Sequence, residues 1–182
     1  MSVYRRWMLR ALRFTRSSMS SIIAGILLFF LYLMIFGFSG QNGEESGSLS
    51  HLISEKCVEI INSLSGRHWT VLMQQQLATY FEHPIRKLAH FSEYAVMGIL
   101  VYILWKNRVI FRKNLFLLVT LWVFLSAGLD EFHQLFVPGR YGCFADVCLD
   151  TCGGMFGFLL MFLWEKVRDR GKGKKEMKTK SI

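Results

Sequence analysis

The chain has 182 residues and a formal net charge of +9 at pH 7, and 52% of its residues are hydrophobic. This length allows one domain, but the apolar content and the scarcity of proline do not fit an ordinary soluble one. The positive charge would suit a nucleic-acid-binding protein. The basic residues are grouped along the chain, however, in a way that is typical of a membrane protein. The positive charge therefore does not require a nucleic-acid partner.

Four apolar segments have a length close to that of a membrane-spanning helix, which needs roughly 20 mostly apolar residues. They cover about residues 20–38, 86–105, 115–137 and 146–164. We therefore expect one all-α integral membrane domain over residues 1–182, built as a four-helix transmembrane bundle. The Arg-rich start and the first apolar run also resemble a signal peptide, but the run is long for one, so we expect an uncleaved anchor.

The basic residues lie in three places: before the first span, in the short loop 106–114, and in the tail 165–182. Together these places hold 17 Lys and Arg against 3 Asp and Glu, whereas the rest of the chain holds 5 against 10. By the positive-inside rule, both termini and the short loop are cytoplasmic. A basic tail beside anionic lipid accounts for the charge without a nucleic-acid partner.

The segment between the first two spans, about residues 48–82, has apolar residues at helical spacing but is too polar to span. It predicts amphipathic helices that lie on the outer interface or fold over the mouth of the bundle. A new helix should begin at His83-Pro84, since proline suits the first turn of a helix.

Polar residues recur near the outer ends of spans two, three and four, and their spacing places most of them on one face of each helix. In span three, Glu131 is displaced from the face that the other polar residues share. Ionisable groups within a membrane are expensive and usually functional, so the pattern predicts an outward-facing polar site. The residues are Arg86, Lys87, His90 and Glu93 in span two, Asp130, Glu131, His133 and Gln134 in span three, Arg140 in the following turn, and Asp146 and Asp150 in span four.

A purely structural interpretation pairs these charges within the bundle. It joins Arg86 or Lys87 to Asp146, Arg140 to Glu131 or Asp150, and His90 to Glu93. Six acidic residues face three basic ones at the outer ends, so pairing alone leaves an excess of acid. A metal site formed by His90, Glu93, Asp130 and His133 is a further alternative, because these residue types at helical spacing can ligate zinc or manganese.

The glycines of span four and the cysteines indicate further packing contacts and a possible disulfide. Gly153 and Gly157 continue the Asp146 and Asp150 stripe as a GxxxG, which either packs within the bundle or joins two copies, so the oligomeric state stays open. Cys57 and Cys143 would both lie outside and could form a disulfide, whereas Cys148 and Cys152 are expected to be small packing residues.

The stretches RKLAHFSEY and DEFHQLFVPGR, the Asp and Gly stripe of span four, and FSGQ at the end of span one resemble the VanZ-like family of small membrane proteins. One departure is Cys152, where the family pattern has asparagine. The resemblance implies a lower susceptibility to the antibiotic teicoplanin. It brings no established substrate, reaction or cofactor.

Together, the resemblance and the residues predict a site that binds or modifies a membrane lipid or a lipid-linked cell-wall precursor. Arg86, Lys87 and Arg140 would hold phosphate or carboxylate oxygens. The alternative is a non-enzymatic accessory bundle that shields or scaffolds envelope components. The candidate catalytic residues are Glu93, Asp130, Glu131 and His133, and the other candidate substrate-binding residues are His90, Gln134, Asp146 and Asp150.

Overall fold

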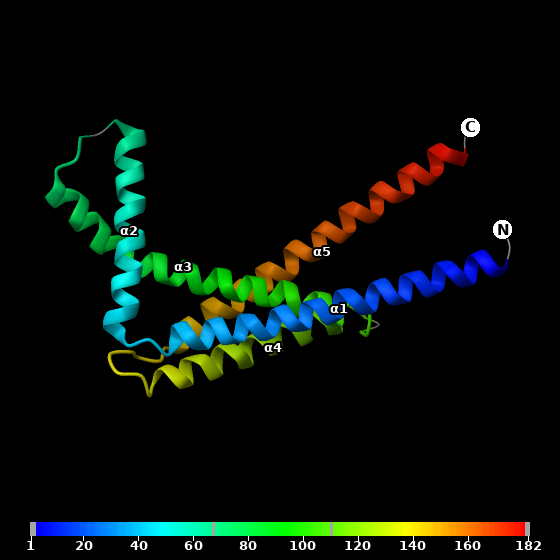
Figure 1. The fold of residues 1–182 in the computed structure, drawn as a ribbon, viewed down its shortest axis with the longest axis horizontal. Helices are drawn as coiled ribbons and strands as arrows, with labels where there is room; N and C mark the ends of the chain where they lie inside the picture. Colours follow the sequence, from blue (N-terminus) through cyan, green and yellow to red (C-terminus); the bar gives the residue numbers. More distant parts are fainter. Residues whose placement is uncertain (1–2, 67, 110, 181–182) are drawn as a thin grey trace.

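The computed structural model describes the backbone of residues 3–66, 68–109 and 111–180, and side chains between residues 18 and 171 of these ranges. The described residues form five helices and no strand. The helices are α1 (Val3–Ser39), α2 (Gly43–Ser65), α3 (Val71–Trp105), α4 (Arg112–Gln134) and α5 (Phe144–Lys180) (Figure 1).

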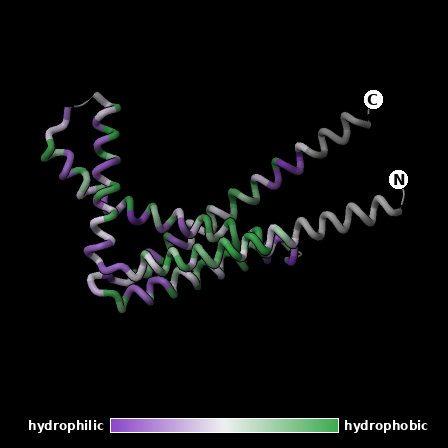
Figure 2. Tube along the Cα trace, viewed as in Figure 1, coloured by the Kyte–Doolittle hydropathy of each residue, from purple (hydrophilic) through white to green (hydrophobic). Residues whose placement is uncertain are grey.

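Four of these helices run alongside one another as a bundle, and α2 lies across one end of it (Figure 1). Segments long and apolar enough to cross a membrane lie in the same four helices: Ser18–Ser39, Val71–Trp105, Arg112–Gln134 and Phe144–Gly171. The hydrophobic stretches overlap along the middle of the bundle (Figure 2). The predicted all-α, four-helix membrane architecture is confirmed.

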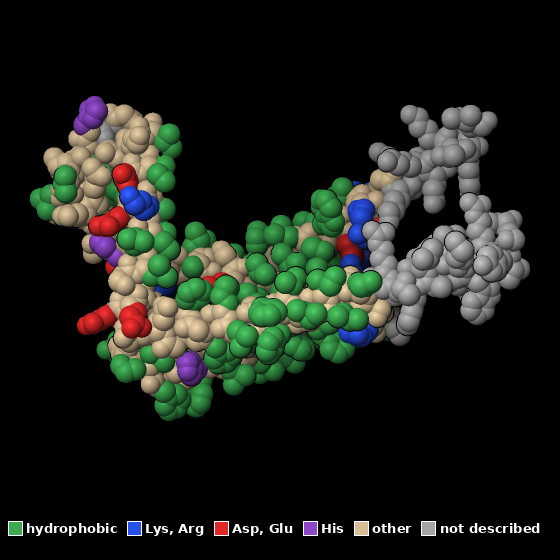
Figure 3. All heavy atoms as spheres, in the orientation of Figure 1, with side chains coloured by type: hydrophobic (Ala, Val, Ile, Leu, Met, Phe, Trp, Pro, Cys, Tyr) green, Lys and Arg blue, Asp and Glu red, His purple; other side chains and the backbone are tan. Residues whose placement is uncertain are grey.

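The two ends of the bundle differ in their loops and charges. The α2 end holds α2, the α1–α2 connection and the loop between α4 and α5; the opposite end holds the α3–α4 connection and both termini (Figure 1). Lys and Arg side chains gather at that opposite end, beside the residues drawn in grey (Figure 3). We call it the basic end, formed by residues 106–113 and 165–171.

The bundle interior is filled by apolar side chains from all four long helices. Leu28 and Ile35 of α1 are buried with Met97 of α3, Val123 of α4 and Phe158 of α5. Large apolar side chains also cover the outside of the bundle, where a soluble protein would be polar, so the surrounding solvent must be lipid. Since α1 supplies part of the core, the bundle depends on it.

Close approach of α3 and α5 explains the glycines of the polar stripe. A Cβ on Gly157 would lie 2.0 Å from the carbonyl oxygen of Ala95, and one on Gly153 would lie 2.4 Å from that of Phe91. Gly98 and Gly154 meet in the same way, since a Cβ on Gly98 would lie 2.1 Å from the carbonyl oxygen of Gly154. The GxxxG therefore packs within the bundle.

The expectation that a new helix starts at His83-Pro84 is wrong, because α3 runs through Pro84 without a break. It begins at Val71, where the side chain of Thr70 accepts a hydrogen bond from the Met73 amide. Its first turns pack on α2, and Ser54 Oγ donates to the Ala78 carbonyl over 2.6 Å. This packing keeps the segment helical although proline disfavours a helix interior. The helix changes direction between this part and the bundle (Figure 1).

Candidate functional site

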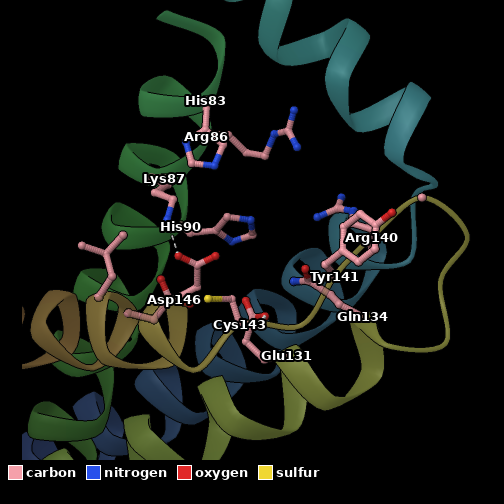
Figure 4. A pocket seen from close by; sticks show the side chains of 13 residues that line it. His83, Arg86, Lys87, His90, Glu131, Gln134, Arg140, Tyr141, Cys143 and Asp146 are labelled. Atoms are coloured by element: carbon pink, nitrogen blue, oxygen red, sulfur yellow. Dashed lines mark hydrogen bonds and ion pairs between the residues drawn. The ribbon is translucent and has the colours of Figure 1, made fainter.

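A cavity of about 360 Å³ opens at the α2 end between α3, α4, α5 and the loop that joins α4 to α5 (Figure 4). Polar stripes from three helices meet around it, as their common depth in the sequence predicts. Eight of the eleven candidate residues line it: Arg86, Lys87, His90, Glu131, Gln134, Arg140, Asp146 and Asp150.

On the α3 side, the two basic residues are paired. Lys87 Nζ lies 2.5 Å from Asp146 Oδ1, so one of the predicted ion pairs is present. Arg86 instead lies 2.8 Å from Glu82 Oε1 one turn earlier on the same helix, and its Nε donates to Ser50 Oγ of α2 over 3.4 Å. These contacts hold the Arg86 guanidinium at the edge of the cavity.

Arg140 does not form the predicted pair with Glu131 or Asp150. Its Nη2 donates to the Phe38 carbonyl over 2.9 Å and its Nε to the Gln41 carbonyl over 3.2 Å. The last carbonyls of a helix lack helical partners and attract cations, which explains why an arginine docks at the end of α1.

The loop before Arg140 is anchored to the start of α2. Gly43 N donates to the Pro138 carbonyl over 3.1 Å, and a Cβ on Gly43 would lie only 2.3 Å from the Gly139 carbonyl oxygen. Gly139 itself has a φ of 75°, which a side chain would strain. The VPGR turn is thereby fixed beneath α2 and delivers Arg140 to the cavity.

The guanidinium groups of Arg86 and Arg140 face one another across the cavity (Figure 4). Burial, and after it the positive charge of Arg86, lowers the pKa of Arg140. Its ordinary value is so high that the group stays charged at neutral pH. Arg86 is paired with Glu82, whereas no carboxylate among the described residues lies within ion-pair distance of Arg140, so the Arg140 charge has no counter-charge in direct contact with it.

The opposite side of the cavity is acidic. Glu131 is buried, and its Oε2 accepts a hydrogen bond of 2.8 Å from the Cys143 amide at the start of α5. Asp150 is only 2% exposed, and no hydrogen bond or ion pair reaches its carboxylate from the described residues. Helical spacing predicts that Glu131 lies off the polar face that its neighbours in α4 share. Glu131 nevertheless lines the cavity, because the α4–α5 loop folds back over it.

Asp130 and His133 lie outside this cavity. Asp130 Oδ2 accepts hydrogen bonds from Ser39 Oγ over 2.9 Å and from Gln134 Nε2 over 3.2 Å, in the contact between α1 and α4. The His133 ring packs edge-on against Phe36 of α1, with 5.7 Å between the ring centres. Both therefore join helices, and Gln134 alone connects this contact with the cavity.

Glu93 faces an adjoining recess of about 190 Å³ between α2 and α3. Its Oε2 lies 3.5 Å from His90 Nδ1, which agrees with the predicted pair. The recess shares Arg86, His90 and Arg140 with the cavity, and its remaining walls are largely apolar: Phe38, Leu49, Ile53, Ile85 and Ala89. A charged cavity and an apolar recess therefore meet at the same three side chains.

The four residues of the metal alternative are not brought together. No group of three or more His, Cys, Asp and Glu close enough to hold an ion exists among the side chains that the structure describes. His90 and Glu93 meet, but His133 packs on Phe36 and Asp130 is occupied by Ser39 and Gln134. All four cysteines are free and exposed, so Cys57 and Cys143 form no disulfide and Cys148 and Cys152 do not pack in the core.

Sequence reasoning missed a second polar cluster, at the basic end. Glu165 of α5 accepts a hydrogen bond of 2.6 Å from the Tyr102 hydroxyl and lies 2.7 Å from Lys106 Nζ. Arg168 lies 3.8 Å from the same carboxylate. The available signal was an acidic residue, Glu165, directly at the end of the last apolar run and followed at once by basic residues.

A family model described as VanZ/LLP1 matches residues 24–165. The chain belongs to the VanZ/LLP1 family. The match covers most of the first and last bundle segments, all of the other two, α2 and every residue that lines the cavity, and it confirms the family indicated by the sequence motifs. Neither the curated proteins nor the solved structures contain a match to this VanZ/LLP1 protein.

Proposed function

We propose that this VanZ/LLP1 protein binds the phosphate-bearing head of a membrane lipid or lipid-linked cell-envelope component at its α2 end, and that binding lowers susceptibility to teicoplanin. The observation that carries the proposal is the convergence of Arg86 and Arg140 on one cavity (Figure 4). Guanidinium groups match phosphate oxygens with paired donors, and an anion between them would supply the counter-charge that Arg140 lacks.

The distribution of charge supports an outward-facing site. Basic residues collect at the end with the termini and the α3–α4 connection, and the positive-inside rule assigns that end to the cytoplasm. The cavity is at the opposite end, at the depth of the outer leaflet. Cell-envelope lipids and their precursors are exposed there, and teicoplanin acts on that surface.

The adjoining recess supports a ligand with a hydrocarbon part. It lies between α2 and α3 and shares its basic residues with the cavity, while Leu49, Ile53 and Ile85 supply apolar walls. A phosphate held by Arg86 and Arg140 would thus have an apolar seat directly beside it. A small soluble anion would leave this surface exposed, which favours a lipid.

The proposal is one of binding. Of the four candidate catalytic residues, Glu131 alone lines the cavity; Asp130 and His133 join α1 to α4, and Glu93 faces the recess. A reaction would need acid and base groups at the bound phosphate. Glu131, Asp150 and His90 are the groups positioned for that role, should the ligand be modified as well as bound.

The test measures the binding of short-chain phosphatidylglycerol to the full-length protein in maltoside micelles by native mass spectrometry. Arg86→Gln should weaken binding about tenfold, the effect expected for one charge-assisted hydrogen-bonding group. Lys56→Gln is the matched control, because Lys56 lies on α2 with its charge paired to Glu59, away from the cavity. Equal affinity of wild type and Arg86→Gln would contradict the proposal.

A second measurement connects binding with the family phenotype. Cells that express the full chain should lose protection from teicoplanin with Arg86→Gln and keep it with Lys56→Gln. If the Arg86→Gln protein folds, reaches the membrane and still protects, the site is not the source of protection. The accessory-bundle alternative would then account for the phenotype.

A further inference from the structure

The cavity carries opposite charges on its two sides. Arg86 of α3 and Arg140 of the α4–α5 loop face one another across it (Figure 4), whereas Glu131 of α4 and Asp150 of α5 supply acidic groups to its lining. Lys87 and Asp146 lie between them and neutralise each other. A simple anion would satisfy the basic side and leave the acidic side without a counter-charge.

Asp150 is the least satisfied group of the acidic side. Its side chain is almost fully buried, its Oδ1 is closed off from solvent, and its carboxylate accepts no hydrogen bond from the described residues. Glu131 receives one donor, the Cys143 amide. Buried carboxylates normally have several donors, and an unpartnered one is costly. The arrangement therefore lacks a cationic donor.

His90 is the neighbouring residue that could neutralise these acids from within the protein. It lines the cavity, but its Nδ1 lies 3.5 Å from Glu93 Oε2. No direct contact between His90 and Asp150 or Glu131 is within ion-pair distance in the described structure. A ligand group can supply the donor that Asp150 lacks.

We propose that the ligand head is zwitterionic: a phosphate with a primary ammonium group beside it, as in phosphoethanolamine. This inference rests on the proposed function and narrows its ligand class. The phosphate lies between Arg86 and Arg140, and the ammonium donates to Asp150 and Glu131. A primary ammonium has three N–H donors, whereas a quaternary ammonium has the same charge and no donor. The hydrocarbon chain occupies the apolar recess.

The cavity volume fits a head group of this kind. At about 360 Å³ it lies near the lower end of the range for small-molecule sites, roughly 300–1,000 Å³. It can hold a phosphate and a short amine together. The apolar groups that a lipid also carries have their own space in the recess.

Three short-chain lipids with the same acyl chains test the inference on the full-length protein in maltoside micelles. Phosphatidylethanolamine has the phosphate and the N–H donors, phosphatidylcholine has the positive charge without the N–H donors, and phosphatidylglycerol has the phosphate with hydroxyl groups and no positive charge. Phosphatidylethanolamine should bind about tenfold more tightly than either of the other two, since a hydrogen bond to a charged group gives an effect of this size.

Asp150→Asn should lower the affinity for phosphatidylethanolamine to that for phosphatidylglycerol and so abolish the preference. Asp169→Asn is the matched control, because Asp169 is an exposed aspartate of the same helix at the basic end. Should Asp150→Asn fail to fold, Glu131→Gln serves the same purpose. A preference that survives substitution of the acidic side would overturn the inference.

The lipid series also separates the two proposals. If all three lipids bind equally and Arg86→Gln weakens them alike, the zwitterionic head is wrong and the phosphate site stands. If none binds, both proposals fail. Preference for phosphatidylglycerol over phosphatidylethanolamine would show that the acids are neutralised internally, by His90, and would also overturn the inference.

Discussion

The hydroxyl of Ser39, the last residue of α1, donates a hydrogen bond of 2.9 Å to Oδ2 of Asp130 in α4, and both side chains are buried. Gln134 Nε2 donates to both oxygens, over 3.3 Å to Ser39 and 3.2 Å to Asp130. Gln134 also lines the cavity, so the contact that fastens α1 to α4 forms part of the cavity wall.

Ser39→Ala should lower the free energy of unfolding by about 1–3 kcal/mol, because it removes one of the two donors to a buried carboxylate. Titration with a denaturing detergent measures the change. Ser48→Ala is the control, since Ser48 is exposed on α2 and bonds only to the Glu45 carbonyl; its effect should stay within about 0.5 kcal/mol. Equal effects of the two substitutions would remove the proposed role of Ser39.

Gly157→Ala should also destabilise the bundle, because the new Cβ would meet the Ala95 carbonyl oxygen at 2.0 Å and push α5 from α3. Overpacking of this kind costs about 1–3 kcal/mol. In contrast, Gly128→Ala in α4 meets nothing within 4 Å and should be neutral or stabilising by up to about 1 kcal/mol. If both substitutions are harmless, the close α3–α5 contact is wrong.

The cluster at the basic end gives a prediction that is independent of the cavity at the α2 end. Glu165→Ala leaves Tyr102 and Lys106 without their partner and should cost about 1–3 kcal/mol. Asp169→Ala removes the same charge from the same helix at an exposed position and should be nearly neutral. Lipid binding at the α2 end should be unchanged in both variants, which separates loss of stability from loss of function.

Orientation in the membrane can be tested with a cysteine already present. Cys57 is exposed on α2, so a membrane-impermeant maleimide added to intact cells should label it in a chain whose other three cysteines, Cys143, Cys148 and Cys152, are replaced by serine. A cysteine placed by Asn107→Cys at the basic end, with all four native cysteines replaced by serine, should be labelled only after the membrane is permeabilised. The reverse pattern would place the cavity in the cytoplasm and refute the outer-leaflet site.

Much of this arrangement follows from helical spacing. Arg86 and His90 lie one turn apart in α3, and Asp146 and Asp150 lie one turn apart in α5, so each pair had to face one way. The four long apolar runs determined the bundle in the same manner. Regular geometry within one helix is thus sufficient to predict which side chains share a face.

Contacts that depend on loops and on the rotation of neighbouring helices were not predictable. Arg140 was expected to meet an acid, but the VPGR turn carries it to the carbonyls at the end of α1. Helical spacing predicted that His133 shares the polar face of α4 and that Glu131 does not. In the structure, Glu131 lines the cavity and His133 packs against Phe36. Helical spacing predicts which residues share a face of a helix, but it does not predict which neighbouring helix or loop that face contacts.

Pro84 links the fold with the site and gives the last prediction. Proline has no N–H, so the Tyr80 carbonyl one turn earlier lacks its helical donor, although α3 continues through this point.

Pro84→Ala restores that donor and removes the ring, and it should raise the free energy of unfolding by up to about 3 kcal/mol. It should also straighten α3 and shift the turn that carries Arg86 relative to Arg140, since the first part of α3 is held by α2 and the remainder by α5. Binding of phosphatidylglycerol should therefore weaken while stability increases. Leu88→Ala, an exposed residue of the same helix, is the control and should change neither quantity appreciably. A Pro84→Ala protein that binds as well as wild type would show that the cavity does not depend on the change of direction in α3.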